Sequence, residues 1–196
     1  MKLETKIDQG PHKKNMPSNP PNQQLSLVVI APDGAQVLRR LAEYAANTSC
    51  NIVEARETPV GDSTAIVMLA DGSWDAIVRL EQAIPKVAEK LRVKITTQRV
   101  QLAAPATERL PYAVDLSSAD KPGILSGLIE FFMSRDILIM ELSARSYPAT
   151  HTGALLFTVQ MNIGLPRDMH IATIREEFMD FCDNMNLDAI LEPIKG

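Results

Sequence analysis

The chain has 196 residues, of which 45% are hydrophobic and 22% are charged. These fractions are typical of globular proteins and exclude a chain that is disordered throughout. A net charge of −4 and an aromatic content of 5% argue against a dedicated nucleic-acid binder, which normally presents a basic surface or stacking aromatics. No apolar run approaches the ~18 residues of a membrane-spanning helix, and the length allows one ordinary domain or two small ones.

Residues 1–24 are expected to form a disordered tail. They contain four prolines and only scattered apolar residues, so they cannot build a hydrophobic core. They also lack the apolar stretch of a secretory signal. The two cysteines, Cys50 and Cys182, are far apart and have no Cys or His at metal-ligand spacing. We therefore expect reduced thiols in a cytoplasmic protein.

Residues 25–101 begin and end with β-rich segments. Strands are expected at 25–31, 50–58, 64–70 and 93–101. The connection between the second and third strands is short and contains Pro59 and Gly61. This connection predicts an antiparallel hairpin.

Two helices are expected between these strands. Apolar residues at helical spacing mark the first helix: Val37, Leu38, Leu41, Ala42 and Ala45. The second helix begins near Trp74. We expect Pro85 to interrupt it and to open a short second helical piece that ends near Leu91.

Residues 102–110 are expected to be a linker. The ten residues 102–111 contain two prolines, Pro105 and Pro111, and proline disfavours both helix interiors and central strands. The second half of the chain, residues 111–196, then repeats the order of elements found in the first. Its strands are expected at 111–117, 137–146, 154–163 and 187–194, and its helices at 124–132 and 171–185.

The two halves align at an offset of 87 residues. This offset brings Asp33 onto Asp120 and Ile52 onto Ile139, and it places the apolar face of one helix on that of the other. Agreement in helix phase, in the preceding Asp and in the following strand indicates an internal repeat.

The repeated order β-α-β-β-α-β is the split βαβ pattern. We therefore predict an α+β protein of two ferredoxin-like units, residues 25–101 and 111–196, each with a four-stranded antiparallel sheet and two helices on one face. The other face of each sheet stays bare, and about 80 residues are few for independent stability. Packing between the repeats or between chains, and hence a homo-oligomer, is expected.

The loop before the first helix of the second repeat is the most informative segment for function. Gly123 allows close approach of backbone, and Pro122 suits a first helical turn. The first amides of a helix have no partner within it and favour a carboxylate, such as that of an amino acid. Asp120 could accept hydrogen bonds from a ligand amino group, or it could merely cap the helix. Both interpretations remain open at this point.

The sequence Asp120-Lys-Pro-Gly-Ile-Leu125, which opens a helix within a βαββαβ unit, resembles the ACT domain, a small fold that binds amino acids in regulatory proteins. The segments Gly72-Ser-Trp74 and Leu80-Glu-Gln-Ala-Ile-Pro85 of the first repeat support this resemblance. Two ACT-like units without another domain resemble the glycine cleavage system transcriptional repressor family. The resemblance covers about residues 25–195.

The resemblance implies a non-enzymatic, amino-acid-sensing regulator of glycine cleavage or amino-acid metabolism, which acts through a partner protein and needs no cofactor. It implies an effector such as glycine, often held between ACT units. The implied ligand-binding residues are Asp120, Lys121, Pro122, Gly123, Ile124 and Leu125. The first repeat has Ala35 and Gln36 in place of Pro122 and Gly123. A second site at Asp33, Gly34 and Ala35 is therefore only a possibility.

Two other functions stay open. The chain could be an allosteric or scaffold subunit of an amino-acid biosynthetic enzyme. Direct DNA binding has one feature in its favour, a basic stretch made of Lys86, Lys90, Arg92, Lys94 and Arg99. The sequence contains no nucleotide-binding or catalytic motif, and the three histidines, His12, His151 and His170, have no partner at ligand or triad spacing. We therefore expect no enzyme, no metal and no membrane association.

Overall fold

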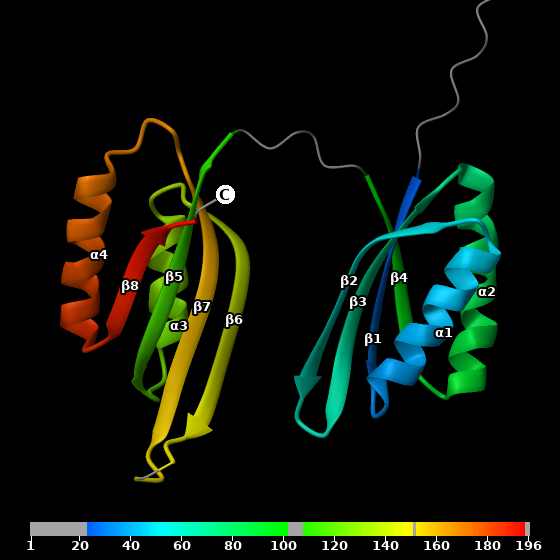
Figure 1. Cartoon of the computed structure of the whole chain (residues 1–196), viewed down its shortest axis with the longest axis horizontal. Coiled ribbons are helices and arrows are strands. Elements are labelled where there is room, and N and C mark those ends of the chain that lie inside the picture. Colours follow the sequence, from blue (N-terminus) through cyan, green and yellow to red (C-terminus); the bar gives the residue numbers. More distant parts are fainter. Residues whose placement is uncertain (1–22, 102–107, 151, 195–196) are drawn as a thin grey trace, which may run out of the picture. The chain divides into compact units, whose positions relative to one another are not determined.

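Two βαββαβ units follow one another along the chain (Figure 1). This computed structural model describes residues 23–101, 108–150 and 152–194. The chain divides into residues 1–103, here called unit one, and residues 104–196, here called unit two. Most of the predicted tail, up to residue 22, lies outside the described residues.

Unit one is a four-stranded antiparallel sheet covered on one face by two helices (Figure 1). The strands are ordered β2-β3-β1-β4 across the sheet. The elements are β1 (Gln23–Ala31), α1 (Gly34–Asn47), β2 (Asn51–Val60), β3 (Ser63–Gly72), α2 (Trp74–Leu91) and β4 (Ile95–Val100).

Unit two repeats this architecture, with strand order β6-β7-β5-β8. Its elements are β5 (Leu110–Ala119), α3 (Ile124–Met133), β6 (Leu138–Pro148), β7 (Leu155–Leu165), α4 (Ile171–Met185) and β8 (Asp188–Pro193). The predicted fold class, two ferredoxin-like units with both helices on one face of each sheet, is confirmed.

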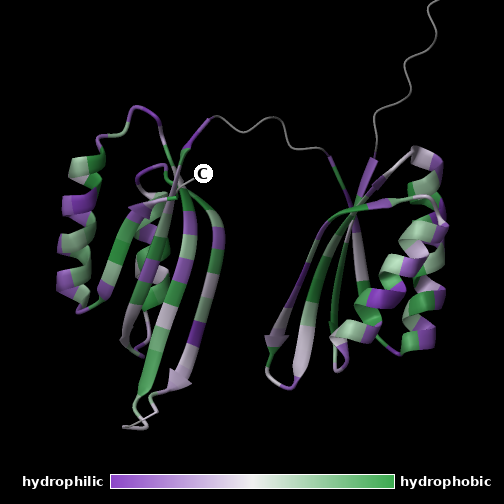
Figure 2. Ribbon diagram, in the orientation of Figure 1, coloured by the Kyte–Doolittle hydropathy of each residue, from purple (hydrophilic) through white to green (hydrophobic). Residues whose placement is uncertain are grey.

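Each unit has its own hydrophobic core between its sheet and its helices. Side chains of a strand alternate between the two faces, so every second residue of β1 points toward the helices. Those residues are Leu25, Leu27, Val29 and Ala31, and all are buried. Hydrophobic and hydrophilic residues also alternate along the strands of unit two (Figure 2). The helices contribute buried residues at helical spacing, such as Val37, Leu41 and Ala45 in α1.

The core of unit two is richer in aromatic rings than that of unit one. Four phenylalanines from α3 and α4 pack together there, with neighbouring ring centroids 5.1–6.5 Å apart: Phe131, Phe132, Phe178 and Phe181. At the offset of 87, Phe131 and Phe132 correspond to Tyr44 and Ala45. Rings at these separations attract one another beyond simple burial, and they join α3 to α4.

The strand register confirms the repeat in detail. Both edge hairpins contain a shift in register at the same place, between Ile52 and Glu54 and between Ile139 and Glu141. Such bulges are specific features of a fold. The offset between equivalent residues is 87 before the hairpin turn and 93 after it, because the second turn is longer.

The expectation of a break at Pro85 is wrong. Helix α2 runs without interruption from Trp74 to Leu91, with Pro85 inside it. Pro85 lies on the exposed side of the helix, and it removes the amide that would pair with the carbonyl four residues earlier. Ile84 and Val87 are buried on either side of it. Their packing against the sheet holds both halves of the helix in line.

Two predicted boundaries differ from the structure by a few residues. Strand β1 begins at Gln23, two residues inside the predicted tail. Within the predicted linker, residues 102–107 lie outside the described residues. Arg109 instead belongs to the folded part of unit two, where its guanidinium contacts the carbonyl and carboxylate of Asp136. Local composition suggested a linker here because it cannot reveal such a long-range ion pair.

Candidate functional site

The loop between β5 and α3, residues 120–123, is here called loop two. It carries four of the six residues predicted to bind a ligand, and all four are exposed. The backbone amide of Asp120 donates to the carbonyl of Leu155, 3.0 Å away, at the start of β7. The Ser146 hydroxyl, on β6, donates to Asp120 Oδ2 over 2.7 Å. Loop two is therefore tied to two strands, and the Asp120 carboxylate is held by one of its two oxygens.

Gly123 precedes α3 in a left-handed conformation, with φ of +96°. Only glycine adopts this conformation without strain. A Cβ at this position would meet no described atom within 4 Å. The first helical hydrogen bond runs from the Gly127 amide to the Gly123 carbonyl, over 2.9 Å. Glycine is thus required here by the backbone rather than by crowding.

Helix α3 receives no side-chain cap from the described residues. Asp120 lies three residues before Gly123 and makes its side-chain bond to Ser146 instead. The capping interpretation of Asp120 is therefore wrong. The first backbone amides of α3 are left to solvent or to a ligand, at the positive end of the helix dipole.

The last two predicted residues, Ile124 and Leu125, have a different role. Ile124 is 3% exposed and belongs to the core of unit two, and Leu125 is half-buried against that core. Their side chains anchor the first turn of α3, so only their backbone amides can face a ligand at this end. The exposed loop two is thus followed directly by a buried anchor in the first turn of α3.

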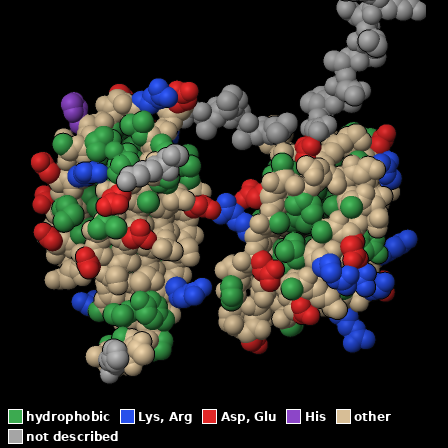
Figure 3. All heavy atoms as spheres, viewed as in Figure 1, with side chains coloured by type: hydrophobic (Ala, Val, Ile, Leu, Met, Phe, Trp, Pro, Cys, Tyr) green, Lys and Arg blue, Asp and Glu red, His purple; other side chains and the backbone are tan. Residues whose placement is uncertain are grey.

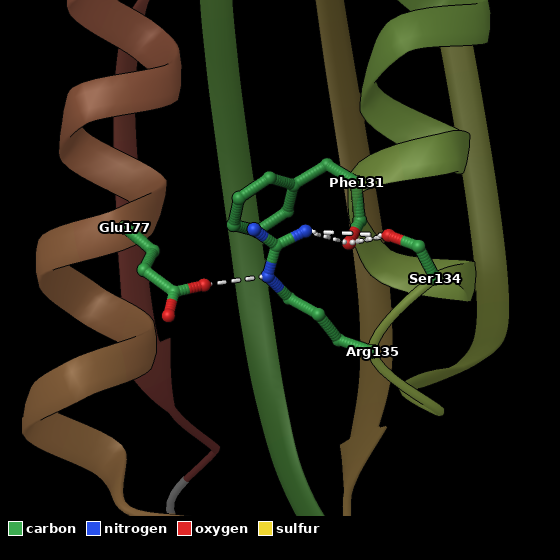
Figure 4. Close-up of polar contacts among 4 residues, drawn as sticks. All are labelled: Phe131, Ser134, Arg135 and Glu177. Atoms are coloured by element: carbon green, nitrogen blue, oxygen red, sulfur yellow. Dashed lines mark hydrogen bonds and ion pairs between the residues drawn. The ribbon is translucent and has the colours of Figure 1, made fainter.

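The other end of α3 is fixed to α4 by Arg135 (Figure 4). Its guanidinium lies 3.9 Å from the centroid of the Phe131 ring, donates to the Phe131 carbonyl over 2.9 Å, and pairs with Glu177 over 2.7 Å. It also donates to the Ser134 hydroxyl. A cation at a helix C-terminus stabilises the helix dipole. Arg135 thus secures the helix whose opposite end forms the candidate site.

The equivalent loop of unit one, residues 32–36, is here called loop one, and it is closed. The Asp33 carboxylate accepts a hydrogen bond from the Gln36 amide over 3.0 Å and so caps α1. Gly34 is buried, and a Cβ there would lie 2.6 Å from Thr64 Cγ2 and 2.7 Å from Glu57 Oε1. Ala35 is exposed. The possible second site therefore has its helix end occupied by its own aspartate.

The two loops differ because the helices begin at different places. Helix α1 begins at Gly34, whereas α3 begins at Ile124, the equivalent of Val37. At the position of Thr64, which packs against Gly34, unit two has Phe157, a larger residue packed against its core. A backbone segment cannot approach a phenylalanine ring as closely as a threonine. This exchange accounts for the later start of α3.

Sequence reasoning missed Ser146, which is separated from Asp120 by 26 residues. A serine near the end of a predicted strand carries no signal of its own. It would be found only by combining the hairpin register, which pairs Ser146 with Phe157, with the pairing of β5 and β7. That combination places the end of β6 beside the loop that leaves β5.

A metal centre has no candidate in the parts of the chain that the structure describes. They contain no group of three or more His, Cys, Asp or Glu side chains suited to a metal ion. His170 precedes α4, and His12 and His151 lie outside the described residues. No helix in the described ranges is long and apolar enough to cross a membrane. The described residues thus offer no cluster of side chains suited to a metal ion.

Both cysteines are buried and free. Burial in the core of unit two raises the pKa of the Cys182 thiol to about 11, with a smaller contribution from the negative charge of Asp183. A thiol with so high a pKa is protonated and unreactive at neutral pH. Cys182 is thus a core residue rather than a nucleophile.

The basic stretch at the end of unit one is spread over two elements. Lys86 and Lys90 lie on α2, and Arg99 lies on β4, where it pairs with Glu81 of α2 over 2.7 Å. Charged side chains of both signs are interspersed over the visible surface of both units (Figure 3). One cation of the basic stretch, Arg99, is therefore already paired with an acidic residue of unit one.

Comparison with known proteins shows which family part of the chain matches. Residues 23–98 match the sequence model of the ACT domain family. The chain resembles a tandem ACT-domain protein. The matched segment is essentially unit one, whereas the motif that carried the resemblance in the sequence lies in unit two.

Other comparisons match most of the chain. The glycine cleavage system transcriptional repressors of Escherichia coli (strain K12) and Shigella flexneri are each 24% identical over 162 residues, which cover 83% of this chain and 85% of theirs. A crystal structure provisionally named a glycine cleavage system transcriptional repressor has 22% identity and a TM-score of 0.69. A protein of unknown function from Galdieria sulphuraria has 18% identity and the same TM-score. Each structural match covers 89% of this chain and 99% of the other.

Proposed function

We propose that the protein is a non-enzymatic regulator that senses a free α-amino acid at loop two. The ligand carboxylate would accept hydrogen bonds from the first backbone amides of α3. The ligand ammonium group would pair with the carboxylate of Asp120. This arrangement uses both charged groups that every α-amino acid shares, so it fits an effector such as glycine.

The observation that carries this proposal is the difference between the two helix ends. In unit one, the Asp33 carboxylate accepts a hydrogen bond from one of the first amides of α1, that of Gln36. In unit two, none of the described side chains occupies those of α3. An external carboxylate at α3 would do what Asp33 does at α1, and it would gain from the same dipole.

The hydrogen bond from Ser146 supports a role for Asp120 in recognition. It fixes one carboxylate oxygen and leaves Oδ1 without a hydrogen bond from the described residues. A carboxylate whose orientation is already fixed loses less entropy when it binds an ammonium group. Lys121, exposed beside it, places a positive charge near the expected ligand carboxylate.

Regulation would follow if the amino acid binds two arrangements of the protein with different affinity. The relatives named as transcriptional repressors of the glycine cleavage system suggest the output. We infer a cytoplasmic protein that controls glycine cleavage or amino-acid metabolism through contact with a regulatory partner protein. No cofactor has a role in this mechanism.

Calorimetric titration with glycine, serine and the branched-chain amino acids tests the proposal. We expect binding of at least one of them, and its loss in Gly123→Val, because a branched side chain cannot adopt the φ of Gly123 without strain. The circular dichroism spectrum of this variant should match that of the wild type. Absence of heat and of a thermal shift with every amino acid would contradict the sensor function. Unchanged affinity in Gly123→Val would place the site elsewhere.

A further inference from the structure

The two units differ most on the sheet faces that their helices leave bare. In unit one, the centre of this face is formed by Val28 and Val67, which are directly paired across β1 and β3 and are 43% and 45% exposed. Ile30, the next residue of β1 on the same face, is 61% exposed. Large apolar residues gathered on one exposed sheet face indicate a contact surface.

Cross-strand pairing gives the extent of this surface. Val67 pairs with Arg56 on β2, and Val28 pairs with Thr96 on β4. In the neighbouring row, Leu69 pairs with Glu54 and Ser26. These residues, together with Ile30 and Ala65, are here called the unit-one sheet face. The charged residues of this set, Arg56 and Glu54, form an ion pair of 2.7 Å, so the set carries no net charge; Asp71 lies in the next row, at its margin.

The equivalent face of unit two is polar at its centre, with the exposed side chain of Ile190 beside it. At the positions of Val28 and Val67 it has Asp115 and Gln160, which share a hydrogen bond of 3.1 Å. A shallow cavity of about 470 Å³ lies over these residues and is also lined by Asp188. Burying this face against an apolar surface would remove its carboxylates from water, which costs much free energy.

We propose that the unit-one sheet face associates with the same face of a second copy of this chain. A two-fold symmetric contact places one surface patch against itself, so the patch must tolerate its own charge. The unit-one sheet face meets this condition because it is neutral and apolar at its centre. An axis lying across the strands would also bring Arg56 opposite the second copy's Glu54. The face of unit two meets the condition less well, because its acidic residues Asp115, Asp188 and Glu141 outnumber its basic residue Arg145.

The size of the face predicts a weak dimer. Four strands spaced ~4.8 Å apart, with about 20 Å of exposed length, give roughly 400 Å² per copy. The total of about 800 Å² is half that of a standard protein–protein interface. We therefore expect association that depends strongly on concentration. The contact lies on the side of the sheet opposite the helices, so it does not require an amino-acid ligand.

Sedimentation velocity without ligand, over about 1 μM to 1 mM protein, tests this proposal. The wild type should shift from monomer toward dimer as the concentration rises. Val67→Glu and Val67→Lys should each remain monomeric, and an equimolar mixture of the two variants should associate again. Gln160→Lys, at the equivalent position of unit two, is the matched control and should associate like the wild type.

Each alternative result overturns the proposal. A wild type that is monomeric throughout shows that the face has no such partner. Dimerisation that persists in both Val67 variants places the contact elsewhere. Variants that remain monomeric even when mixed show that the face does not meet its own copy. Circular dichroism checks that both variants are folded, and Val28→Lys repeats the test at the directly paired position.

Discussion

Units one and two have the same fold, but they differ in the loop before the first helix and in the sheet face that the helices leave bare. Unit one has a closed loop, in which Asp33 caps α1, and an apolar sheet face. Unit two has an open loop, in which α3 receives no cap from a described side chain, and a polar sheet face. We propose that this difference gives the repeats different roles, a contact surface in unit one and a ligand site in unit two.

The largest expected effect is a loss of stability in the core of unit two that leaves the core of unit one unchanged. Phe132→Ala places at this position the residue that unit one has at Ala45. It removes a fully buried ring and should lower the free energy of unfolding of unit two by about 3–5 kcal/mol. Trp74, the only tryptophan, lies in unit one. Its fluorescence in a denaturant titration should therefore report an unchanged transition, while circular dichroism shows an earlier one. An equal shift in both signals would show that the units unfold together.

Substitution of Gly34 in loop one and of Gly123 in loop two should lower stability for different reasons. Gly34→Ala would place a Cβ 2.6 Å from Thr64 and should destabilise unit one by about 1–3 kcal/mol. Gly123→Ala meets no described atom, and its cost should be the backbone strain of a positive φ, about 1–2 kcal/mol. Trp74 fluorescence should detect the first change and not the second. An unperturbed Gly34→Ala transition would contradict the closed structure of loop one.

The two equivalent aspartates should differ in their effect on stability. Asp33→Ala removes the cap of α1 and should cost about 1 kcal/mol in the free energy of unfolding. Asp120→Ala removes an exposed carboxylate that caps no helix, so its cost should stay within about 0.5 kcal/mol. Urea denaturation followed by circular dichroism measures both. A larger loss in Asp120→Ala would mean that this residue is structural.

The smallest expected effect concerns Cys182. Its pKa of about 11 in the folded protein lies above the ordinary value of 9.0. Between these values the unfolded thiol loses its proton while the folded one keeps it, so stability should fall as the pH rises from about 9 to 11. Cys182→Ala should show a smaller decrease over this range. At pH 8, a thiol reagent should label Cys182 only on unfolding, and rapid labelling of the folded protein would contradict its burial.

The fold could be predicted from the sequence because the signals that determine it are local and occur twice. Helical spacing in residues 37–45, the Pro59 and Gly61 turn, and the shared offset of 87 each lie within a short segment or its copy. The interruption expected at Pro85 was wrong because tertiary packing of Ile84 and Val87 outweighs the local preference of proline.

The candidate site was only partly accessible from the sequence. Residues 120–125 could be selected because a Pro-Gly helix start has a local signature. Capping by Asp33 but not by Asp120 depends on where each helix begins, and the exchange of Thr64 for Phe157 on another strand accounts for that difference. Ser146 reaches Asp120 only through the pairing of three strands. Such contacts are determined by register, which composition and periodicity specify poorly.

We propose that loop two, and not loop one, binds an amino acid through Asp120. The most direct test compares the calorimetric affinity of Asp120→Asn with that of Asp33→Asn, using the amino acid that binds the wild type. Loss of the ion pair with the ligand ammonium should weaken binding in Asp120→Asn by at least about tenfold, which corresponds to ~1.4 kcal/mol. Asp33→Asn should bind like the wild type. Equal affinity in Asp120→Asn, or a larger loss in Asp33→Asn, would contradict the account.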